Sequence, residues 1–200
     1  MTLHYKSIGF SAILCILSST IALSNHEYDF QKNLVSLGFY DKSVLPNNIP
    51  RPPHPLFWKS QLKADEGLNL TYERNVFHTQ KYFSVNLGTS FSWWNTHSQA
   101  QLALSGFFDL YIWIFRTTTF SPYISWSVGG PTLLSRRWLN GVNLGSHLIF
   151  QDFLGIGVKL GKQHVVDVNL KMYHYSNGDL FVHNNGFDVP VVLSIDYLFH

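Results

Sequence analysis

The sequence predicts an all-β protein that folds as one eight-stranded antiparallel transmembrane β-barrel of the outer membrane. Three observations lead to this fold class. From residue 66 onward apolar and polar residues alternate, which is the two-residue period of a strand with two unlike faces. Several alternating runs are longer than ten residues, which suits a tilted membrane-spanning strand. Aromatic residues make up 16% of the chain and charged residues only 13%, a composition that suits contact with lipid.

The first 24 residues are expected to form a secretory signal peptide. A short leader with Lys6 precedes an apolar run from Ile8 to Leu23, and Ala22-Leu23-Ser24 supplies the small residues of a cleavage site. A retained membrane anchor is the alternative, but the run is short for a span and no basic cluster follows it. One mature domain is expected over residues 25–200. It can form no disulfide, because the only cysteine lies in the leader.

The first two strands flank a proline-rich segment. Residues 33–41 (NLVSLGFYD) and residues 66–75 (EGLNLTYERN) have alternating patterns. Between them, residues 42–65 include SVLPNNIPRPPHP, and these prolines exclude regular structure over most of the segment. The sequence therefore predicts a long loop here, and we assign no chemistry to it.

Six further strands complete the predicted barrel. The clearest is residues 81–94, in which apolar residues from Phe83 to Trp93 alternate with serine, asparagine and glycine. Turn signals such as Gly161-Lys162 and Asn177-Gly178 separate the later strands. An even number of strands can close into a barrel, which removes the exposed edges of long apolar strands. The six runs are residues 81–94, 101–115, 120–129, 145–160, 164–176 and 187–199.

Periodicity alone leaves two barrels open: a soluble barrel with its apolar face inside and a membrane barrel with that face outside. The signal peptide, the long aromatic-rich strands and an opposite face of Ser, Asn, Gly, Tyr and Asp favour the membrane barrel. The net charge of +2 shows no basic stripe of the kind that nucleic-acid binding needs. Four tryptophans are expected to be interfacial anchors or barrel filling: Trp93, Trp94, Trp113 and Trp126.

One strand, HVVDVNLKMYHYS, carries candidate chemistry. His174 and Ser176 extend its apolar stripe, and their spacing puts both side chains on one face, where the imidazole could accept the hydroxyl proton. This arrangement suits an esterase that acts on lipid. The alternative is an interfacial histidine and a serine that ends the strand before an Asn-Gly turn.

HYSNG, followed by Asp188 within NNGFD, resembles the signature of the PagL family of outer-membrane lipid A 3-O-deacylases. SPYISWSVGG (residues 121–130) and NLGSHLIFQDFLGIGVKL (residues 143–160) also resemble strands of the family, and the resemblance covers roughly residues 68–199. It implies hydrolysis of the ester-linked hydroxyacyl chain at the 3-position of lipid A, in the outer membrane of a Gram-negative cell and without a cofactor. It also allows a homodimer.

The resemblance implies a role for each matching residue. Ser176 is the expected nucleophile, His174 the base and Asp188 the acid that orients the imidazole. Oxyanion donors are expected around Asn177 and Gly178. The side chain of Asn184 is a further candidate, although a loop asparagine can equally support a turn.

Two departures from the family pattern concern the acid. The pattern often has glutamate where this chain has the shorter Asp188. Regular alternation of the last strand would also place Asp188 on the lumen face, away from His174, unless an irregularity at Pro190 resets the register. Asp179 and Asp152 are the alternative acids.

Two other readings of the chemistry remain. His183 and His164 could suggest a metal site with His174, but their spacing matches no metal motif and a serine hydrolase needs no metal, so none is expected. The rival functions are an acyl hydrolase that acts on phospholipid and a barrel without catalysis.

Overall fold

The computed structural model describes residues 32–43, 58, 60–79 and 81–200. The expected signal peptide, residues 1–24, and most of the proline-rich segment lie outside the described residues. No helix within the described residues is long and apolar enough to cross a membrane.

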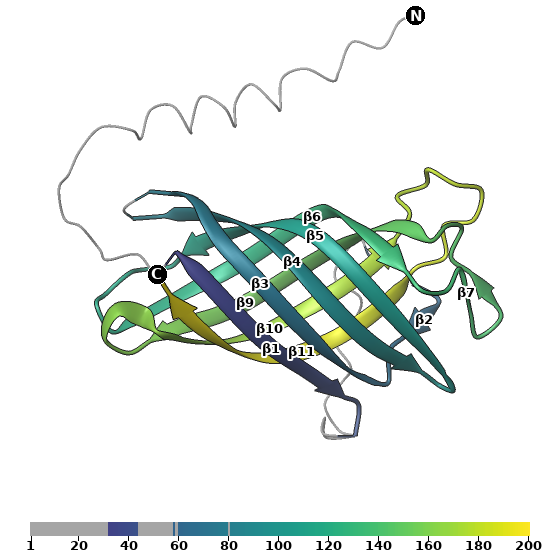
Figure 1. The fold of residues 1–200 in the computed structure, drawn as a ribbon, viewed down its shortest axis with the longest axis horizontal. Coiled ribbons are helices and arrows are strands. Elements are labelled where there is room, and N and C mark those ends of the chain that lie inside the picture. The colour runs from purple at the N-terminus through teal and green to yellow at the C-terminus, as the bar shows by residue number, and fades with distance from the viewer. Residues whose placement is uncertain (1–31, 44–57, 59, 80) are drawn as a thin grey trace, which may run out of the picture.

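Eight long antiparallel strands close into a barrel, as the sequence predicts (Figure 1). Each strand pairs with the next along the chain, and the first and last strands pair through Asn33–Phe199 to Phe39–Leu193. The strands are β1 (Asn33–Asp41), β3 (Glu66–His78), β4 (Phe83–Thr96), β5 (Gln99–Trp113), β6 (Phe120–Leu134), β9 (Leu148–Leu160), β10 (Val166–Ser176) and β11 (Phe187–Phe199).

Three short strands and one turn of 3-10 helix complete the described fold. β7 (Trp138–Leu139) and β8 (Val142–Asn143) form a hairpin between β6 and β9, and η1 (Lys162–His164) joins β9 to β10. β2 (Leu62–Lys63) pairs in parallel with the start of β11. The predicted long loop over residues 42–65 thus contains one short strand, β2, near its end, where the chain has passed the last prolines.

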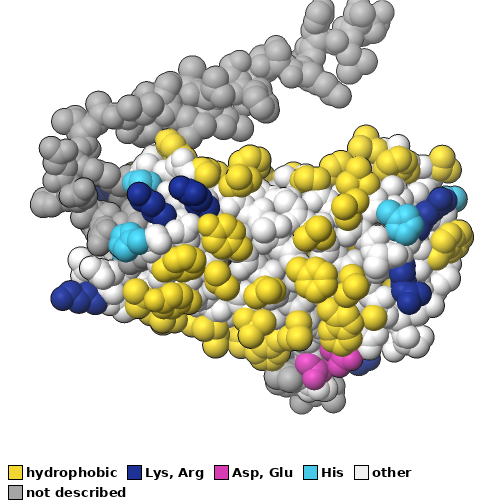
Figure 2. Space-filling view, viewed as in Figure 1, with side chains coloured by type: hydrophobic (Ala, Val, Ile, Leu, Met, Phe, Trp, Pro, Cys, Tyr) yellow, Lys and Arg dark blue, Asp and Glu magenta, His cyan; other side chains and the backbone are white. Residues whose placement is uncertain are grey.

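The two faces of the barrel are as unlike as the alternation indicates. Apolar side chains such as Leu37, Leu70 and Ile195 are exposed on the outside, and Figure 2 shows apolar side chains over much of the wall. The inside buries polar groups that bond to one another. For example, Lys171 Nζ lies 2.8 Å from Asp109 Oδ2 and 3.5 Å from Glu73 Oε1. This arrangement is that of a membrane barrel and excludes the soluble alternative.

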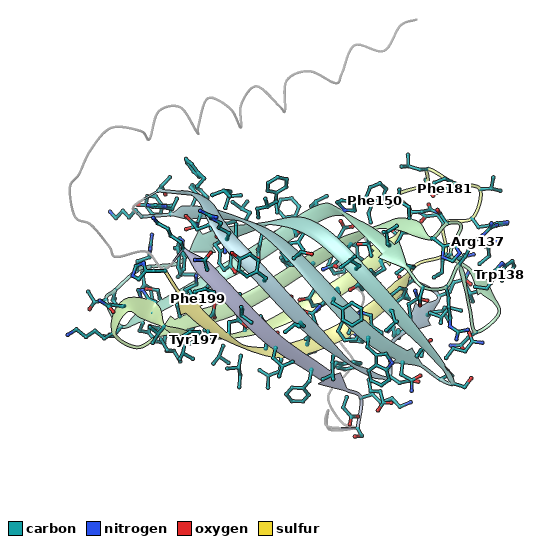
Figure 3. All side chains as sticks on the ribbon, viewed as in Figure 1. Arg137, Trp138, Phe150, Phe181, Tyr197 and Phe199 are labelled. Atoms are coloured by element: carbon teal, nitrogen blue, oxygen red, sulfur yellow. The ribbon has the colours of Figure 1, made fainter. Side chains whose placement is uncertain are left out.

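One end of the barrel differs from the other. Figure 3 places Phe150, Phe181, Arg137 and Trp138 at the end with the β7–β8 hairpin, and Tyr197 and Phe199 at the opposite end. At the hairpin end the interior is filled by a cluster of buried apolar side chains that includes Trp94, Phe153, Tyr175 and Phe187.

Two of the four tryptophans lie inside the barrel and two on its outer side. Trp94 and Trp113 are buried in the barrel, whereas Trp126 is exposed on the outside and Trp93 is partly exposed.

Candidate active site

His174 and Asp188 form a hydrogen-bonded pair on the outer face of the barrel. They lie directly opposite each other on β10 and β11, and His174 Nδ1 is 2.7 Å from Asp188 Oδ1. Both are almost fully buried, with 7% and 6% of their surface exposed. A carboxylate at Nδ1 favours the tautomer that carries its proton there, which leaves the lone pair of Nε2 available as a base.

An irregularity in β11 makes this pairing possible. Lys171 pairs with Val192, but Tyr173 pairs with Val189, so β11 has one more residue than β10 over this stretch. The extra residue lies at Pro190–Val191, where proline supplies no N–H for the ladder. The bulge turns Asp188 from the lumen face to the outer face, so the register reset expected at Pro190 is present.

Ser176 lies at the end of β10, two residues after His174 on the same face, and pairs with Phe150 of β9. Within the described part of the chain no hydrogen bond joins its hydroxyl to His174. Hydrogen bonds of catalytic groups are often long without substrate and shorten in the complex. The arrangement therefore brings the hydroxyl, the imidazole and the carboxylate to one patch of the outer wall.

The expected oxyanion residues form a hydrogen-bonded turn beside Ser176. The backbone N–H of Asn177 donates to Asn184 Oδ1 at 3.0 Å, and Asn184 Nδ2 donates to Asp179 Oδ1 at 2.8 Å. Asn177 Nδ2 donates to the carbonyl oxygens of Leu144 and His183. These donors are therefore engaged, whereas the amide of Gly178 has no hydrogen-bond partner among the described residues.

The two alternative acids are engaged elsewhere. Asp152 lies across from His174 on β9, but its Oδ1 accepts a hydrogen bond from the backbone N–H of Gly129. Asp179 is exposed and bonds to Asn184. Among the described residues no group of three or more His, Cys, Asp or Glu could hold a metal ion, and His164 bonds to Ser121 instead.

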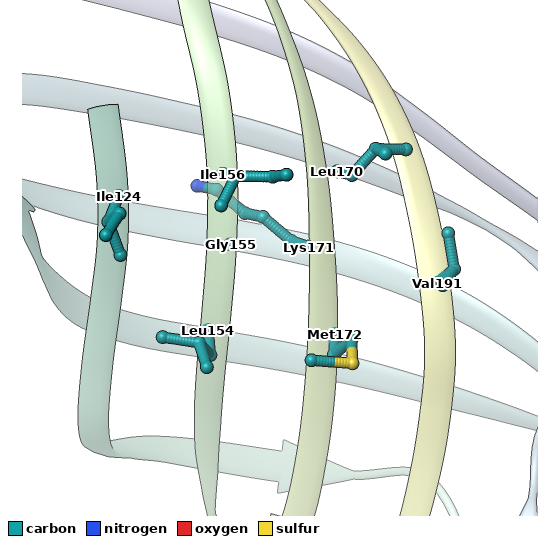
Figure 4. A pocket seen from close by; sticks show the side chains of 8 residues that line it. All are labelled: Ile124, Leu154, Gly155, Ile156, Leu170, Lys171, Met172 and Val191. Atoms are coloured by element: carbon teal, nitrogen blue, oxygen red, sulfur yellow. The ribbon is translucent and has the colours of Figure 1, made fainter. Parts of the chain in front are cut away.

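An apolar groove of about 350 Å³ starts beside this site on the outer wall. Met172 follows His174 toward the middle of β10 and faces Leu154 of β9, and the next pair inward is Leu170 and Ile156. Figure 4 shows these side chains with Ile124 and Val191 along the groove. The groove offers an apolar path whose nearest lining residue to the imidazole is Met172, two residues from His174 on the same face of β10.

The family profile described as lipid A 3-O-deacylase (PagL) matches residues 66–193. The chain belongs to the PagL family. It is thus an ester hydrolase of the outer membrane. Among solved structures it is similar to the crystal structure of the outer membrane enzyme PagL, with 17% identity, a TM-score of 0.54, and coverage of 84% of this chain and 99% of that chain. That likeness supports the fold. The comparison with curated proteins found no match.

The match to the PagL family begins at residue 66 and includes His174, Ser176 and Asp188. The structure brings a segment from before that boundary onto the site. We call residues 58–65 the strap, of which Lys59 is outside the description. Ser60 Oγ donates to Asp188 Oδ1 at 2.6 Å, and the indole of Trp58 stacks on the imidazole of His174.

Sequence reasoning missed the strap because nothing in its residues marks a site. It follows a proline-rich segment and carries no motif, and its contacts with β10 and β11 span more than a hundred residues of chain. Its far end is fixed by Asp65, which accepts hydrogen bonds from Lys42 and from the amide of His97. Partial burial raises the pKa of Asp65, but these hydrogen bonds outweigh burial and hold its pKa below the usual value.

Proposed function

We propose that this chain hydrolyses the ester that holds a hydroxyacyl chain at the 3-position of lipid A. In this proposal Ser176 is the nucleophile, His174 the general base and Asp188 the acid that orients the imidazole. The observation that carries it is the 2.7 Å contact of His174 with Asp188 on the outer wall, two residues from Ser176 and inside the segment that matches the PagL family.

The reaction follows from these groups in two steps. Ser176 Oγ attacks the ester carbonyl while its proton passes to His174 Nε2, and the released sugar hydroxyl then takes that proton. His174 then deprotonates a water molecule, whose oxygen attacks the acyl carbon. The bond from that carbon to Ser176 Oγ breaks, His174 returns the proton to Ser176 Oγ, and the hydroxy fatty acid leaves. Asp188 stays charged throughout and stabilises the imidazolium that forms at each step.

The oxyanion of each tetrahedral intermediate needs hydrogen-bond donors close to Ser176. Asn177, Gly178 and Asn184 are the proposed sources. The amide of Gly178 is the most direct of them, because it has no hydrogen-bond partner among the described residues. The hydrogen bonds of Asn177 and Asn184 hold the turn that presents this amide.

The position of the site suits a substrate within the outer leaflet. Three of the four connections at the site end, residues 42–65, 135–147 and 177–186, are longer than the turns at the other end, and the fourth is the short β4–β5 turn. Outer-membrane barrels place their longer loops outside the cell. The outer wall around the site would then face lipid. Acyl chains would enter the apolar groove below His174 while the sugar stays at the level of Ser176.

The direct test compares the chain with its Ser176→Ala variant in the outer membrane of a Gram-negative host. Mass spectrometry of lipid A should show loss of one hydroxyacyl group with the native chain. The variant should lower the rate by roughly 10⁴-fold or more, because the nucleophile is gone. A heat-dependent shift of the gel band would establish that both barrels are folded.

Two results would count against this function. Unchanged lipid A with release of fatty acid from phospholipid would move the activity to another lipid ester. Unchanged lipid A, unchanged phospholipid and no labelling of Ser176 by a serine-reactive organophosphate would indicate a barrel without catalysis. A homodimer, which the family resemblance allows, is a separate proposal that cross-linking in the membrane would test.

A further inference from the structure

Ser60 contacts both members of the acid–base pair. Its hydroxyl donates to Asp188 Oδ1 at 2.6 Å and lies 3.2 Å from His174 Nδ1, so the three atoms form a triangle. Asp188 Oδ1 therefore accepts from Ser60 as well as facing the imidazole. Two hydrogen-bonding partners on one carboxylate oxygen fix the direction of the carboxylate.

The strap also explains why a pair on the outer wall is buried. Apolar neighbours on the same face remain open, such as Leu170 at 43% exposed and Ile195 at 62%, whereas His174 is only 7% exposed. Trp58, itself 5% exposed, lies over the imidazole with ring centroids 5.3 Å apart and planes within 7°. Its indole thus covers one face of the imidazole.

The strap is attached to β11 beside the acid. Leu62 pairs with Phe187 and Lys63 with Asp188, and the backbone N–H of Ala64 donates to the carbonyl of Asp188 at 2.8 Å. Room for Ser60 exists because residue 186 is glycine. A Cβ there would lie 3.0 Å from Ser60 Oγ, 3.2 Å from the His174 ring and 2.5 Å from the carbonyl of Tyr175.

We propose that Ser60 and Trp58 are positioning residues of the deacylase site. Ser60 holds Asp188 against Nδ1 of His174, and Trp58 fixes the plane of the imidazole and shields the pair. The reaction in this inference is that of the proposed function, whereas the contacts of Ser60 and Trp58 are independent of it. It assigns a role to a segment that lies before the part of the chain matching the family.

The chemical consequence concerns the shorter acid. An aspartate carries its carboxylate on a short, one-methylene side chain, so its reach to the imidazole depends on its backbone and its second hydrogen bond. The strap acts on both: Lys63 pairs with the backbone of Asp188, and the hydroxyl of Ser60 donates the second hydrogen bond. Its loss should leave substrate binding unchanged and impair the proton transfers.

The test measures kcat and KM on purified lipid A with the full-length barrel in lipid vesicles. Ser60→Ala should lower kcat about 10- to 100-fold, the usual worth of a hydrogen bond to a charged group, with KM within about twofold. Ser60→Thr, which keeps the hydroxyl, should recover most of kcat. Ser98→Ala, an exposed serine in the β4–β5 turn, is the matched control and should behave as the native chain.

Trp58 is tested separately. Trp58→Phe keeps an aromatic ring over the imidazole and should retain most of kcat, whereas Trp58→Ala should lower it about 2- to 10-fold, the range expected for an aromatic contact. The downfield imidazole N–H proton, identified by its loss in His174→Gln, should shift in Ser60→Ala. A purely structural serine would leave this resonance in place.

The outcomes separate the inference from the function. Native kcat and an unmoved N–H resonance in a folded Ser60→Ala barrel would overturn the inference. Abolished activity in Ser60→Ala with an active Ser176→Ala would overturn it too, since Ser60 would then be the nucleophile. If lipid A is not the substrate, the rate of organophosphate labelling of Ser176 still decides: a lower rate in Ser60→Ala supports the positioning role, and an equal rate overturns it.

Discussion

Asp188 shows how much one side chain depends on its neighbours. The PagL pattern often has glutamate at this position, and the aspartate here reaches His174 because it lies directly opposite on the adjacent strand. Its contacts with Ser60 and the imidazole are both short, so the site is fitted to the shorter acid.

Substitutions of Asp188 should lower kcat by different amounts. Asp188→Asn removes the charge and should lower kcat roughly 10³- to 10⁴-fold, as when the acid of a triad is neutralised. Asp188→Glu should cost about tenfold, because the longer side chain must displace Ser60 to reach Nδ1. Asp152→Asn should cost less than either, since that carboxylate bonds to Gly129. Lipid A turnover in vesicles measures all three, and a larger loss in Asp152→Asn would make Asp152 the acid.

Gly186 is the second residue on which the site depends. Gly186→Ala places a Cβ 2.5 Å from the Tyr175 carbonyl, so the chain must shift and carry Ser60 and the imidazole apart. We expect a destabilisation of about 1–3 kcal/mol and a kcat lowered about tenfold or more. The control is Gly106→Ala, where an added Cβ has no atom within 4 Å. Equal kcat for the two variants would contradict the close packing described here.

At the scale of elements, the bulge of β11 brings Asp188 to the same face as His174. Alternation predicts which residues of a strand share a face, and it places His174 and Ser176 together correctly. It cannot predict where one extra residue is inserted, because a bulge depends on pairing with the neighbouring strand. Pro190 was the one local signal of it. β6 has a bulge of its own between Ser127 and Gly130, and for this reason the strand continues to Leu134 although its alternation breaks at Gly129 and Gly130.

Two deletions should show whether catalysis depends on the face to which Asp188 points or on the bulge itself. Deleting Val191 leaves a regular strand in which Asp188 still faces His174, so kcat should stay within about tenfold of native. Deleting Pro190 and Val191 together shifts the strand by one further residue, which turns Asp188 toward the lumen. The double deletion should therefore lower kcat by at least about 10²-fold. Similar activity in both folded barrels would show that the face to which Asp188 points does not depend on Pro190 and Val191.

At the scale of the whole molecule, the barrel combines an apolar outside with a charged inside. The number of strands and the closure could be predicted from the period and length of the alternating runs. The orientation of the faces needed more: the expected signal peptide, the aromatic-rich strands and the polar residues of the opposite face. The partners within the lumen could not be predicted. Lys171 bonds across the interior to Asp109 and Glu73, which are far from it in sequence and meet only because the barrel closes.

Lys171→Met should test how far this interior network stabilises the barrel. It leaves Asp109 and Glu73 buried without their cation, and we expect a loss of about 3–5 kcal/mol in the free energy of unfolding. Urea unfolding in vesicles, followed by the gel band shift, measures it. Lys42→Met breaks a pair with Asp65 in which the lysine is exposed to solvent, and it should cost at most about 1 kcal/mol. Adding Asp109→Leu to Lys171→Met should restore part of the loss, whereas no restoration would mean that the charge of Asp109 is balanced by other groups.

The parallel pairing of β2 with β11 has a consequence for biogenesis. It joins the segment between β1 and β3 to β11, and β1 and β11 meet only when the cylinder is complete. A chain in transit through the periplasm would have His174 and Ser176 in its sequence but no assembled strap over them. We therefore expect the hydrolase to be inactive until the barrel has closed in the membrane. The start of lipid A hydrolysis would then mark this last step of assembly.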